Sequence, residues 1–229
     1  MRSRKGCDAT NSSATSTQMT KPKRERQRAA ILTAATQLFT KNGYAQTAMG
    51  DIARRSGMAQ GNTYHYFDSK FDIFIAIFQP WFENELDRLE RRLRHIRNRR
   101  ARLRAILFAL WRDIPQADNG FHNNLMQALA TKNPEERYSR VHLHKMEAKV
   151  ASLIRPSLSI ERRNILDENL FPHLAFMASD GFTIGHKLVG RSKRISRIVD
   201  MTCELLLSEP TWKSPPAPAT RKRRRVDAS

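Results

Sequence analysis

The stretch from Gln46 to Lys70 constrains the fold of this chain more than any other part of it. Its sequence, QTAMGDIARRSGMAQGNTYHYFDSK, holds two short helical patterns separated by Ser56-Gly57. Gly57 can adopt the left-handed conformation that ends a helix, so the first helix stops there and a second is expected at about residues 60–67. Two short helices joined by a glycine-containing turn are typical of a helix-turn-helix, whose second helix enters the major groove of DNA.

Capping residues mark the ends of these helices. Thr47 is predicted to be the N-cap of the first helix, and Ser69 the N-cap of a longer helix that begins at Lys70. Gly50 falls inside the first helix and should cost about 0.5–1 kcal/mol relative to alanine. It also stands where an acidic residue would complete a capping box with Thr47. The local stability of the motif therefore stays open at this point.

The run from about Lys23 to Phe78 resembles the N-terminal domain of the TetR family of bacterial transcriptional regulators. This resemblance covers about a quarter of the chain, and the remainder matches the family only in its helical pattern and length. Departures from the usual pattern occur at Gly50, Phe71 and Ala59, the last of which stands where serine often caps the second helix. The matching residues are Ile31 to Phe39 (IL-AA-LF), Asn42-Gly43-Tyr44, Asp51-Ile52-Ala53, Ser56-Gly57-Met58, Gly61, Tyr64-His65-Tyr66-Phe67 and Ser69-Lys70.

The resemblance implies that the second helix of the motif contacts DNA. The amides of Gln60 and Asn62 can each pair with the N6/N7 edge of adenine, and by resemblance these two residues read bases. Also by resemblance, the hydroxyls of Tyr64 and Tyr66 and the ammonium group of Lys70 contact phosphate. Phe67 is expected to pack inside, whereas His65 is left open between surface and core. The predicted DNA-binding residues are Thr47, Ala48, Ala59, Gln60, Gly61, Asn62, Tyr64, His65, Tyr66 and Lys70.

The chain carries a formal net charge of +19, and this charge is unevenly distributed. Residues 1–28, 88–104 and 219–229 contribute +6, +8 and +4, so the rest of the chain is close to neutral. Three basic segments on a neutral body indicate attraction to phosphate. The alternative for residues 88–104 is a solvated helix face, with Leu89, Leu93 and Ile96 directed inward.

The remaining sequence predicts an all-α protein. Glycine and proline are sparse between residues 23 and 207, and clean strand-like alternation is absent. Pro80 is expected to kink or break the helix that begins after Ser69. The expected helices are 23–41, 69–97 with its interruption, 99–114, 119–131, 135–154, 160–188 and 191–208. The expected domains are a disordered arm at 1–22, a DNA-binding domain at 23–78, an effector-binding and dimerisation domain at 79–209, and a disordered tail at 210–229.

The two termini have no predicted fold. Residues 1–20 are rich in serine and threonine, and Met19 is either the true start or the end of a dispensable arm. A working arm that reaches an adjacent minor groove is the alternative. The C-terminal RKRRR run matches a nuclear localisation pattern, but in a bacterial-type regulator nonspecific phosphate contact is the preferred interpretation.

Two apolar stripes predict a homodimer. A single three-helix module reads few base pairs, so two copies on a palindromic site are expected. Small residues within one stripe would let helices approach closely and form an isologous four-helix contact, in agreement with where the family dimerises. The alternative is that both stripes belong to the core of the monomer. The predicted interface residues are Leu174, Ala178, Gly181, Gly185 and Leu188, followed by Ile195, Val199, Thr202 and Leu206.

The middle helices are expected to enclose a pocket for a small-molecule effector, as in the larger domain of the family. Binding would change the separation of the recognition helices through the helix that Pro80 interrupts, provided that the ligand prefers one of the two states. Aromatic residues at helical spacing are more often core, and lone histidines are usually structural. The predicted lining residues are Trp111, Phe121, His122, Met126, Phe176 and Asp180.

Several other classes of protein are disfavoured. Cys7 and Cys203 are the only cysteines, which indicates neither a disulfide framework nor a metal site, and suits a reducing cytoplasm. No apolar run approaches the roughly 18 residues of a membrane helix. Without a nucleophile elbow or a glycine-rich phosphate loop, we expect neither an enzyme nor a bound cofactor.

The sequence predicts a dimeric, ligand-responsive DNA-binding regulator, most often a repressor in this family. The rivals are a nonspecific nucleic-acid-coating protein and a co-regulator that has lost DNA binding.

Overall fold

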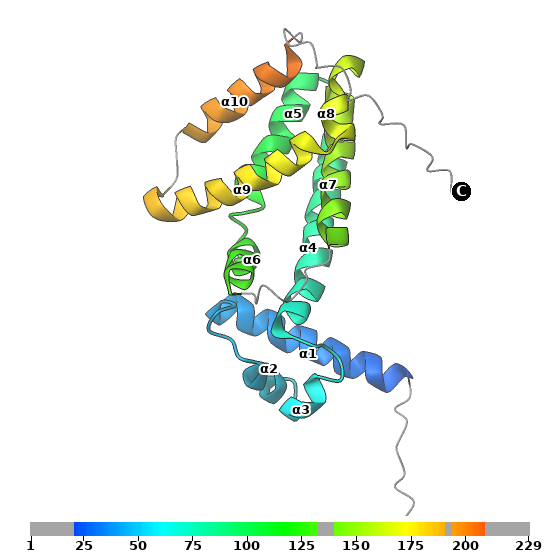
Figure 1. Ribbon diagram of the computed structural model, residues 1–229, viewed down its shortest axis with the longest axis vertical. Helices are drawn as coiled ribbons and strands as arrows, with labels where there is room; N and C mark the ends of the chain where they lie inside the picture. The colour runs from blue at the N-terminus through cyan, green and yellow to red at the C-terminus, as the bar shows by residue number, and fades with distance from the viewer. Residues whose placement is uncertain (1–20, 132–139, 191–193, 209–229) are drawn as a thin grey trace, which may run out of the picture. The chain divides into compact units, whose positions relative to one another are not determined.

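A computed structural model of the chain describes residues 21–131, 140–190 and 194–208 (Figure 1). The described residues are helical and contain no strand, which confirms the all-α class. They divide into two compact units, one formed by residues 21–78 and 127–131 and the other by residues 79–126, 140–190 and 194–208. Within the described ranges, no helix is both long enough and apolar enough to cross a membrane. The predicted arm at 1–22 and tail at 210–229 lie almost wholly outside these ranges.

The first unit is built on α1 (Lys21–Asn42), α2 (Met49–Arg55), α3 (Gln60–Thr63) and the start of α4 (Lys70–Leu93). The predicted inward face of α1 is confirmed for Ile31, Ala35 and Phe39, all of which are buried. The rings of Phe39, Tyr44 and Phe74 contact one another with centroids 5.5–5.6 Å apart. This aromatic cluster joins α1, the following turn and α4 around one core.

Helix α4 runs without a break from Lys70 to Leu93, with Pro80 inside it. Of the two predicted effects of Pro80, the break is therefore wrong, and the kink stays a prediction. A proline removes one backbone donor, but the helix carries a nearly continuous buried face whose packing outweighs that loss. The helix also ends earlier than residue 97, because residues 94 and 95 form a turn and residues 96–98 are irregular. The buried residues of α4 are Phe71, Ile73, Phe74, Phe78, Phe82, Leu86, Leu89 and Leu93.

In the second unit, α5 (Arg99–Phe108) continues directly into a π-helix, η1 (Ala109–Asp113). The amide of Ile114 donates to the carbonyl oxygen of Ala109 at 2.9 Å, which closes the wider turn. The carbonyl oxygen of Leu110 accepts a hydrogen bond from Ser179 Oγ at 2.9 Å. The expected helix at 99–114 is thus present, with an irregular end that contacts α9 (Leu170–Val189).

The predicted helix at 160–188 is wrong as a single element. The chain instead forms two short 3₁₀ turns, η2 (Arg155–Ser157) and η3 (Ile160–Arg162), then α8 (Asn164–Asp167) and α9. Asn169 separates α8 from α9 with a φ of 59°, and its side-chain amide donates to the buried carboxylate of Glu147. Asparagine tolerates this left-handed conformation, and the bond to Glu147 holds it in place.

The remaining helices of the second unit follow the expected order. They are α6 (Phe121–Ala130), which also supplies residues to the first unit, α7 (Arg140–Ile154) and α10 (Arg194–Leu207). Helix α7 contacts α9, and α10 contacts α5 (Figure 1). Because α9 and α10 are each packed on one side only, their opposite faces remain open to solvent.

Candidate nucleic-acid interface and effector region

The turn between α2 and α3 has the geometry that the sequence predicts. Gly57 has a φ of 73°, which confirms its left-handed conformation. Its amide donates to the carbonyl oxygen of Arg54 at 3.2 Å, and the amide of Met58 donates to that of Ala53 at 2.9 Å. These paired bonds form a Schellman motif, which satisfies the last carbonyls of α2 and fixes where α3 begins.

The beginning of α2 differs from the prediction by one residue. Ala48, not Thr47, is the N-cap, and the carboxylate of Asp51 accepts a hydrogen bond from the Ala48 amide at 3.2 Å. Asp51 therefore supplies the acidic partner that Gly50 appeared to remove. Thr47 is only 1% exposed, and its hydroxyl donates to the carbonyl oxygen of Gly43 at 2.8 Å. The side chain of Thr47 therefore serves the core, and a DNA contact of this residue stays a prediction.

Gly50 and Gln60 lie against each other across the motif. A Cβ atom at Gly50 would lie 3.1 Å from Oε1 of Gln60, closer than an ordinary van der Waals contact. The absence of a side chain at Gly50 thus makes room for the amide of Gln60. This close approach gives a structural role to the residue that departs from the usual pattern.

Helix α3 is short, and most of its surroundings are exposed. It ends at Thr63, which is buried, rather than at the predicted residue 67. A turn follows, in which the amides of Tyr66 and Phe67 both donate to the carbonyl oxygen of Thr63. Phe67 is buried, as predicted, whereas His65 is exposed. The predicted DNA-binding residues with exposed positions are Ala48, Ala59, Gln60, Gly61, Asn62, Tyr64 and His65.

Tyr66 and Lys70 are half-buried and already hydrogen-bonded within the unit. The hydroxyl of Tyr66 donates to Oε1 of Gln27 at 2.5 Å. Nζ of Lys70 donates to the carbonyl oxygens of Tyr44 at 2.9 Å and Thr47 at 2.8 Å. Desolvation lowers the pKa of Lys70. One N–H of the Lys70 ammonium stays available for phosphate, and the phosphate contact of Lys70 stays a prediction. The two bonds to carbonyl oxygens give Lys70 a structural role as well.

Ser69 caps α4 as predicted. Its Oγ accepts a hydrogen bond from the amide of Asp72 at 3.1 Å and donates to the Asp72 carboxylate at 2.7 Å. The same region contains contacts that sequence reasoning missed, including the bond of Gln27 to Tyr66. Gln27 lies 39 positions before Tyr66 in the sequence. Nothing in the residues around Gln27 on α1 indicates that its side chain bonds Tyr66.

The predicted dimer stripe on α9 is largely exposed. Leu174 and Leu188 are 56% and 78% exposed, and Gly181 is also at the surface. Ala178 and Gly185 are half-buried on the same helix. Large apolar side chains beside them extend the exposed face. These are Leu170, Met177 and Ile184.

The predicted dimer stripe on α10 faces the core of its own unit rather than solvent. Val199 and Leu206 are buried in the second unit, while Ile195 and Thr202 are half-buried. The α10 stripe therefore fits the alternative prediction that it belongs to the core of the monomer, because α10 packs on α5. The exposed apolar residues of α10 are instead Met201 and Leu205, at 53% and 62% exposure.

The predicted effector residues contribute mainly to the core of the second unit. Trp111 is buried, and its Nε1 donates to the carbonyl oxygen of Ala175 at 2.9 Å. Phe121 is buried against Trp81, with ring centroids 5.3 Å apart. Phe176 lies half-buried, with its centroid 5.8 Å from that of Phe82. Met126 is also half-buried.

His122 and Asp180 are the polar members of the predicted effector set, and they lie together. His122 is 5% exposed, and its Nε2 lies 3.3 Å from Oδ1 of Asp180 in a geometry that makes no hydrogen bond. A buried ring nitrogen without a hydrogen bond carries an energetic cost that a suitable ligand would relieve. This pair is therefore the feature that best fits an effector contact.

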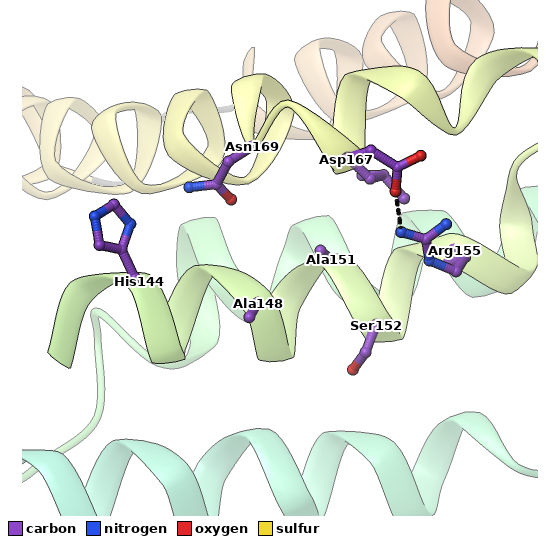
Figure 2. Close-up of a pocket in the computed structure, with 8 residues that line it drawn as sticks. His144, Ala148, Ala151, Ser152, Arg155, Asp167 and Asn169 are labelled. Atoms are coloured by element: carbon purple, nitrogen blue, oxygen red, sulfur yellow. Dashed lines mark hydrogen bonds and ion pairs between the residues drawn. The ribbon is translucent and has the colours of Figure 1, made fainter. Parts of the chain in front are cut away.

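A separate cavity of about 530 Å³ lies between α7 and the segment that contains α8 (Figure 2). Its alanines, Ala148 and Ala151, leave space along α7, and the ion pair between Arg155 and Asp167 crosses one end. None of the six predicted effector residues lines it. The lining residues are His144, Ala148, Ala151, Ser152, Arg155, Leu166, Asp167 and Asn169.

Comparison with known proteins defines the class to which this helix-turn-helix belongs. Residues 31–77 match the family described as bacterial regulatory proteins, tetR family. The matched segment contains the Schellman turn, the short exposed helix and the capped start of α4. The helix-turn-helix of this chain is therefore a domain of the tetR-family type.

Curated relatives are similar to the N-terminal part of the chain. The HTH-type transcriptional activator FasR of Mycolicibacterium smegmatis is 31% identical over 98 residues, which are 43% of this chain and 45% of FasR. The fatty acid metabolism regulator protein of Bacillus subtilis is 37% identical over 60 residues, 26% of this chain and 31% of that protein. The chain thus spans less than half the length of these relatives.

Solved structures share the fold over most of the chain. The transcriptional regulator FadR from Bacillus subtilis, in complex with stearoyl-CoA, covers 79% of this chain and 97% of FadR with a TM-score of 0.51 and 18% identity. A putative transcriptional regulator from Rhodococcus sp. RHA1 covers 81% of this chain and 97% of that protein, with a TM-score of 0.58 and 15% identity. These likenesses extend the fold beyond the helix-turn-helix.

Proposed function

We propose that this protein is a sequence-specific DNA-binding transcriptional regulator that acts as a homodimer on a palindromic operator. The observation that carries this proposal is the exposed group of Gln60, Gly61 and Asn62 at the start of α3, on a turn fixed by the Schellman motif. A recognition helix contacts base edges through its N-terminal residues, so polar side chains exposed there suit base reading.

Base and phosphate contacts divide among the exposed residues by chemistry. Gln60 and Asn62 carry amides that can pair with adenine, and Gly61 has no atom within 4 Å of its ideal Cβ position, so the backbone surface there is open. Tyr64, 47% exposed, offers its hydroxyl to phosphate. Tyr66 and Lys70 remain proposed phosphate contacts, and each would keep or exchange its present hydrogen bond on binding.

Dimerisation is proposed through the exposed faces of α9 and α10. Seven large apolar side chains there are more than half exposed, which is unusual for a monomer in water. Two such helices from each copy would form an isologous four-helix contact. The α10 contribution comes from Met201 and Leu205 rather than from the buried stripe. The seven are Leu170, Leu174, Met177, Ile184, Leu188, Met201 and Leu205.

We also propose that the second unit binds a small-molecule effector beside His122 and Asp180. The support is the buried Nε2 of His122, which lacks a hydrogen bond, next to the partly exposed carboxylate of Asp180. A ligand with a polar group could bond both, while aromatic rings such as Trp111 and Phe176 would contact its apolar part. Effector binding would favour one arrangement of the DNA-binding units over another, with repression as the proposed outcome on the promoter.

Sequencing of genomic fragments retained by the purified protein tests the DNA-binding proposal. The salt concentration should be about 150 mM, at which nonspecific phosphate binding is weakened. We expect a shared palindrome among the retained fragments, and a relaxed version of it with Gln60→Ala. Retention without any shared motif would instead favour a nonspecific nucleic-acid-binding protein that uses its +19 charge.

A further inference from the structure

The first two turns of α1 carry an exposed group of basic side chains. Residues 21–28 contain five lysines or arginines and one glutamate, a net charge of +4. All six charged residues are exposed, and within the described ranges none of them forms an ion pair or a side-chain hydrogen bond. Other arginines of the same unit are engaged. Arg54 pairs with Asp51 at 2.5 Å. Nε of Arg55 donates to Oε1 of Gln37 at 2.7 Å.

Three of these cations continue the packed side of α1. Residues three, four and seven positions apart lie on one side of a helix. Lys21, Arg24 and Arg28 have this spacing. Three and seven positions after Arg28, Ile31 and Ala35 are buried in the core. The packed side of α1 therefore continues toward the N-terminus as three exposed cations, which we call the basic stripe.

Two contacts hold this side of α1 against the turn that follows α3. The hydroxyl of Tyr66 donates to Oε1 of Gln27, the residue before Arg28. The guanidinium of Arg28 lies 4.9 Å from the centre of the Phe67 ring, which is buried. In Figure 1 the N-terminal end of α1 runs past α3. The basic stripe thus begins beside the recognition element and extends away from it along α1.

The stability of α1 alone does not account for the basic stripe. Helix α1 has no acid in its first turn, and the helix dipole disfavours cations there. Lys21 and Arg28 each lie about one turn from Arg24, and like charges at this spacing repel one another. A bound polyanion would relieve both costs.

We propose that the basic stripe of α1 binds the phosphate backbone of duplex DNA beside the recognition helix, without reading its sequence. A helix in the major groove, which is about 12 Å wide, is bordered by the phosphates of both strands. Side chains packed against the turn after α3 would therefore lie next to one of these strands. Arg24 and Arg28 present planar forks that suit phosphate oxygens. The choice of duplex DNA rests on the proposed function, in which α3 enters that groove.

Salt-dependent binding of the full chain to two duplexes tests the basic stripe. One duplex carries the palindrome recovered from genomic fragments, and the other has the same length and composition without it. The test variants are Lys21→Gln/Arg24→Gln and a threefold change that adds Arg28→Gln. The matched control is Arg26→Gln/Lys41→Gln, which removes two exposed charges from the same helix. Arg26 lies roughly 160° around the helix from Arg24, and Lys41 lies in the last turn of α1.

We expect the plot of log affinity against log salt to become shallower by up to about 0.9 for each phosphate contact removed, with the control nearly unchanged. The preference for the palindrome should survive in every variant. Urea denaturation without DNA checks that the variants stay folded. The twofold variant keeps the contact of Arg28 with Phe67, so it tests the basic stripe even if the threefold variant is less stable.

Equal changes of slope in the test and control pairs, or an unchanged slope in the twofold variant, would overturn the proposal. So would a change of slope seen with single-stranded RNA but not with either duplex, which would identify a different polyanion as the partner. If no palindrome is recovered, the proposed function fails, and the second duplex still tests the basic stripe.

Discussion

At the scale of single residues, Lys70 shows how one side chain serves the fold beside its proposed site role. Its ammonium bonds the carbonyl oxygens of Tyr44 and Thr47 and lies 4.1 Å from the centre of the Tyr44 ring. These contacts join the start of α4 to the segment that precedes α2. A loss of DNA affinity on changing Lys70 would therefore combine two effects, the loss of the proposed phosphate contact and a weakened turn.

Replacement of Lys70 with methionine separates these two sources. Lys70→Met keeps the aliphatic stem but leaves two carbonyl oxygens without their donor, so we expect the free energy of unfolding to fall by about 1–3 kcal/mol. Lys41→Met, an exposed change in the same unit, should have little effect. Urea denaturation without DNA measures the difference. If Lys70→Met unfolded at the same urea concentration as the wild type, the two hydrogen bonds would contribute nothing to the free energy of unfolding.

The contact between Gly50 and Gln60 gives a second prediction at this scale. Gly50→Ala should stabilise α2 by roughly 0.5–1 kcal/mol, because alanine is the better helix former. Its Cβ would also displace the Gln60 amide, which lies 3.1 Å from that position. We therefore expect a more stable protein with an altered preference for operator sequence. In a Gln60→Ala background, Gly50→Ala should no longer change that preference, and a persisting effect would argue against the contact.

At the scale of elements, α10 shows how an amphipathic pattern can be assigned to the wrong partner. Its buried face contains Val199, Cys203 and Leu206, while Met201 and Leu205 are exposed. Both faces carry apolar residues at helical spacing, so periodicity alone identifies a helix but not the side that meets α5. The packing of Val199, Cys203 and Leu206 decides that choice, and the exposed salt bridges of Asp200 and Glu204 with α5 accompany it.

Burial of Cys203 on α10 predicts a pH dependence of stability. Desolvation raises the pKa of this thiol in the folded protein above its ordinary value. The unfolded thiol ionises first as pH rises, so the stabilising contribution is complete below the ordinary pKa and is lost toward the raised one. Between about pH 8 and 10, the unfolding free energy of the wild type should fall relative to Cys203→Ala. A constant difference between the two across this range would contradict the prediction.

At the scale of the whole molecule, the proposed dimer would use faces that one chain leaves exposed. Seven large apolar side chains of α9 and α10 lie more than half exposed in the single chain, which supports a second copy as their partner. The helix-turn-helix alone reads only a few base pairs, so the proposed function also requires two copies.

Adjacent leucines of α10 test this assembly. Leu205→Glu places a charge on the exposed face, so we expect a folded monomer by light scattering at micromolar concentration. Leu206→Ala instead removes a buried side chain and should lower the free energy of unfolding by about 2–4 kcal/mol. A dimer that persists with Leu205→Glu would exclude this face as the interface.

The sequence by itself determined the all-α class, the helix-turn-helix with its Gly57 turn, and the Ser69 cap, because glycine turns, caps and helical periodicity act over a few residues. The tertiary structure decided the features that depend on distant partners. These include the burial of Thr47, the bonds of Lys70 to the preceding turn, and the division of the expected 160–188 helix at Asn169 by its bond to Glu147. They also include the face of α10 that meets α5, since which apolar stripe is buried depends on what packs against it.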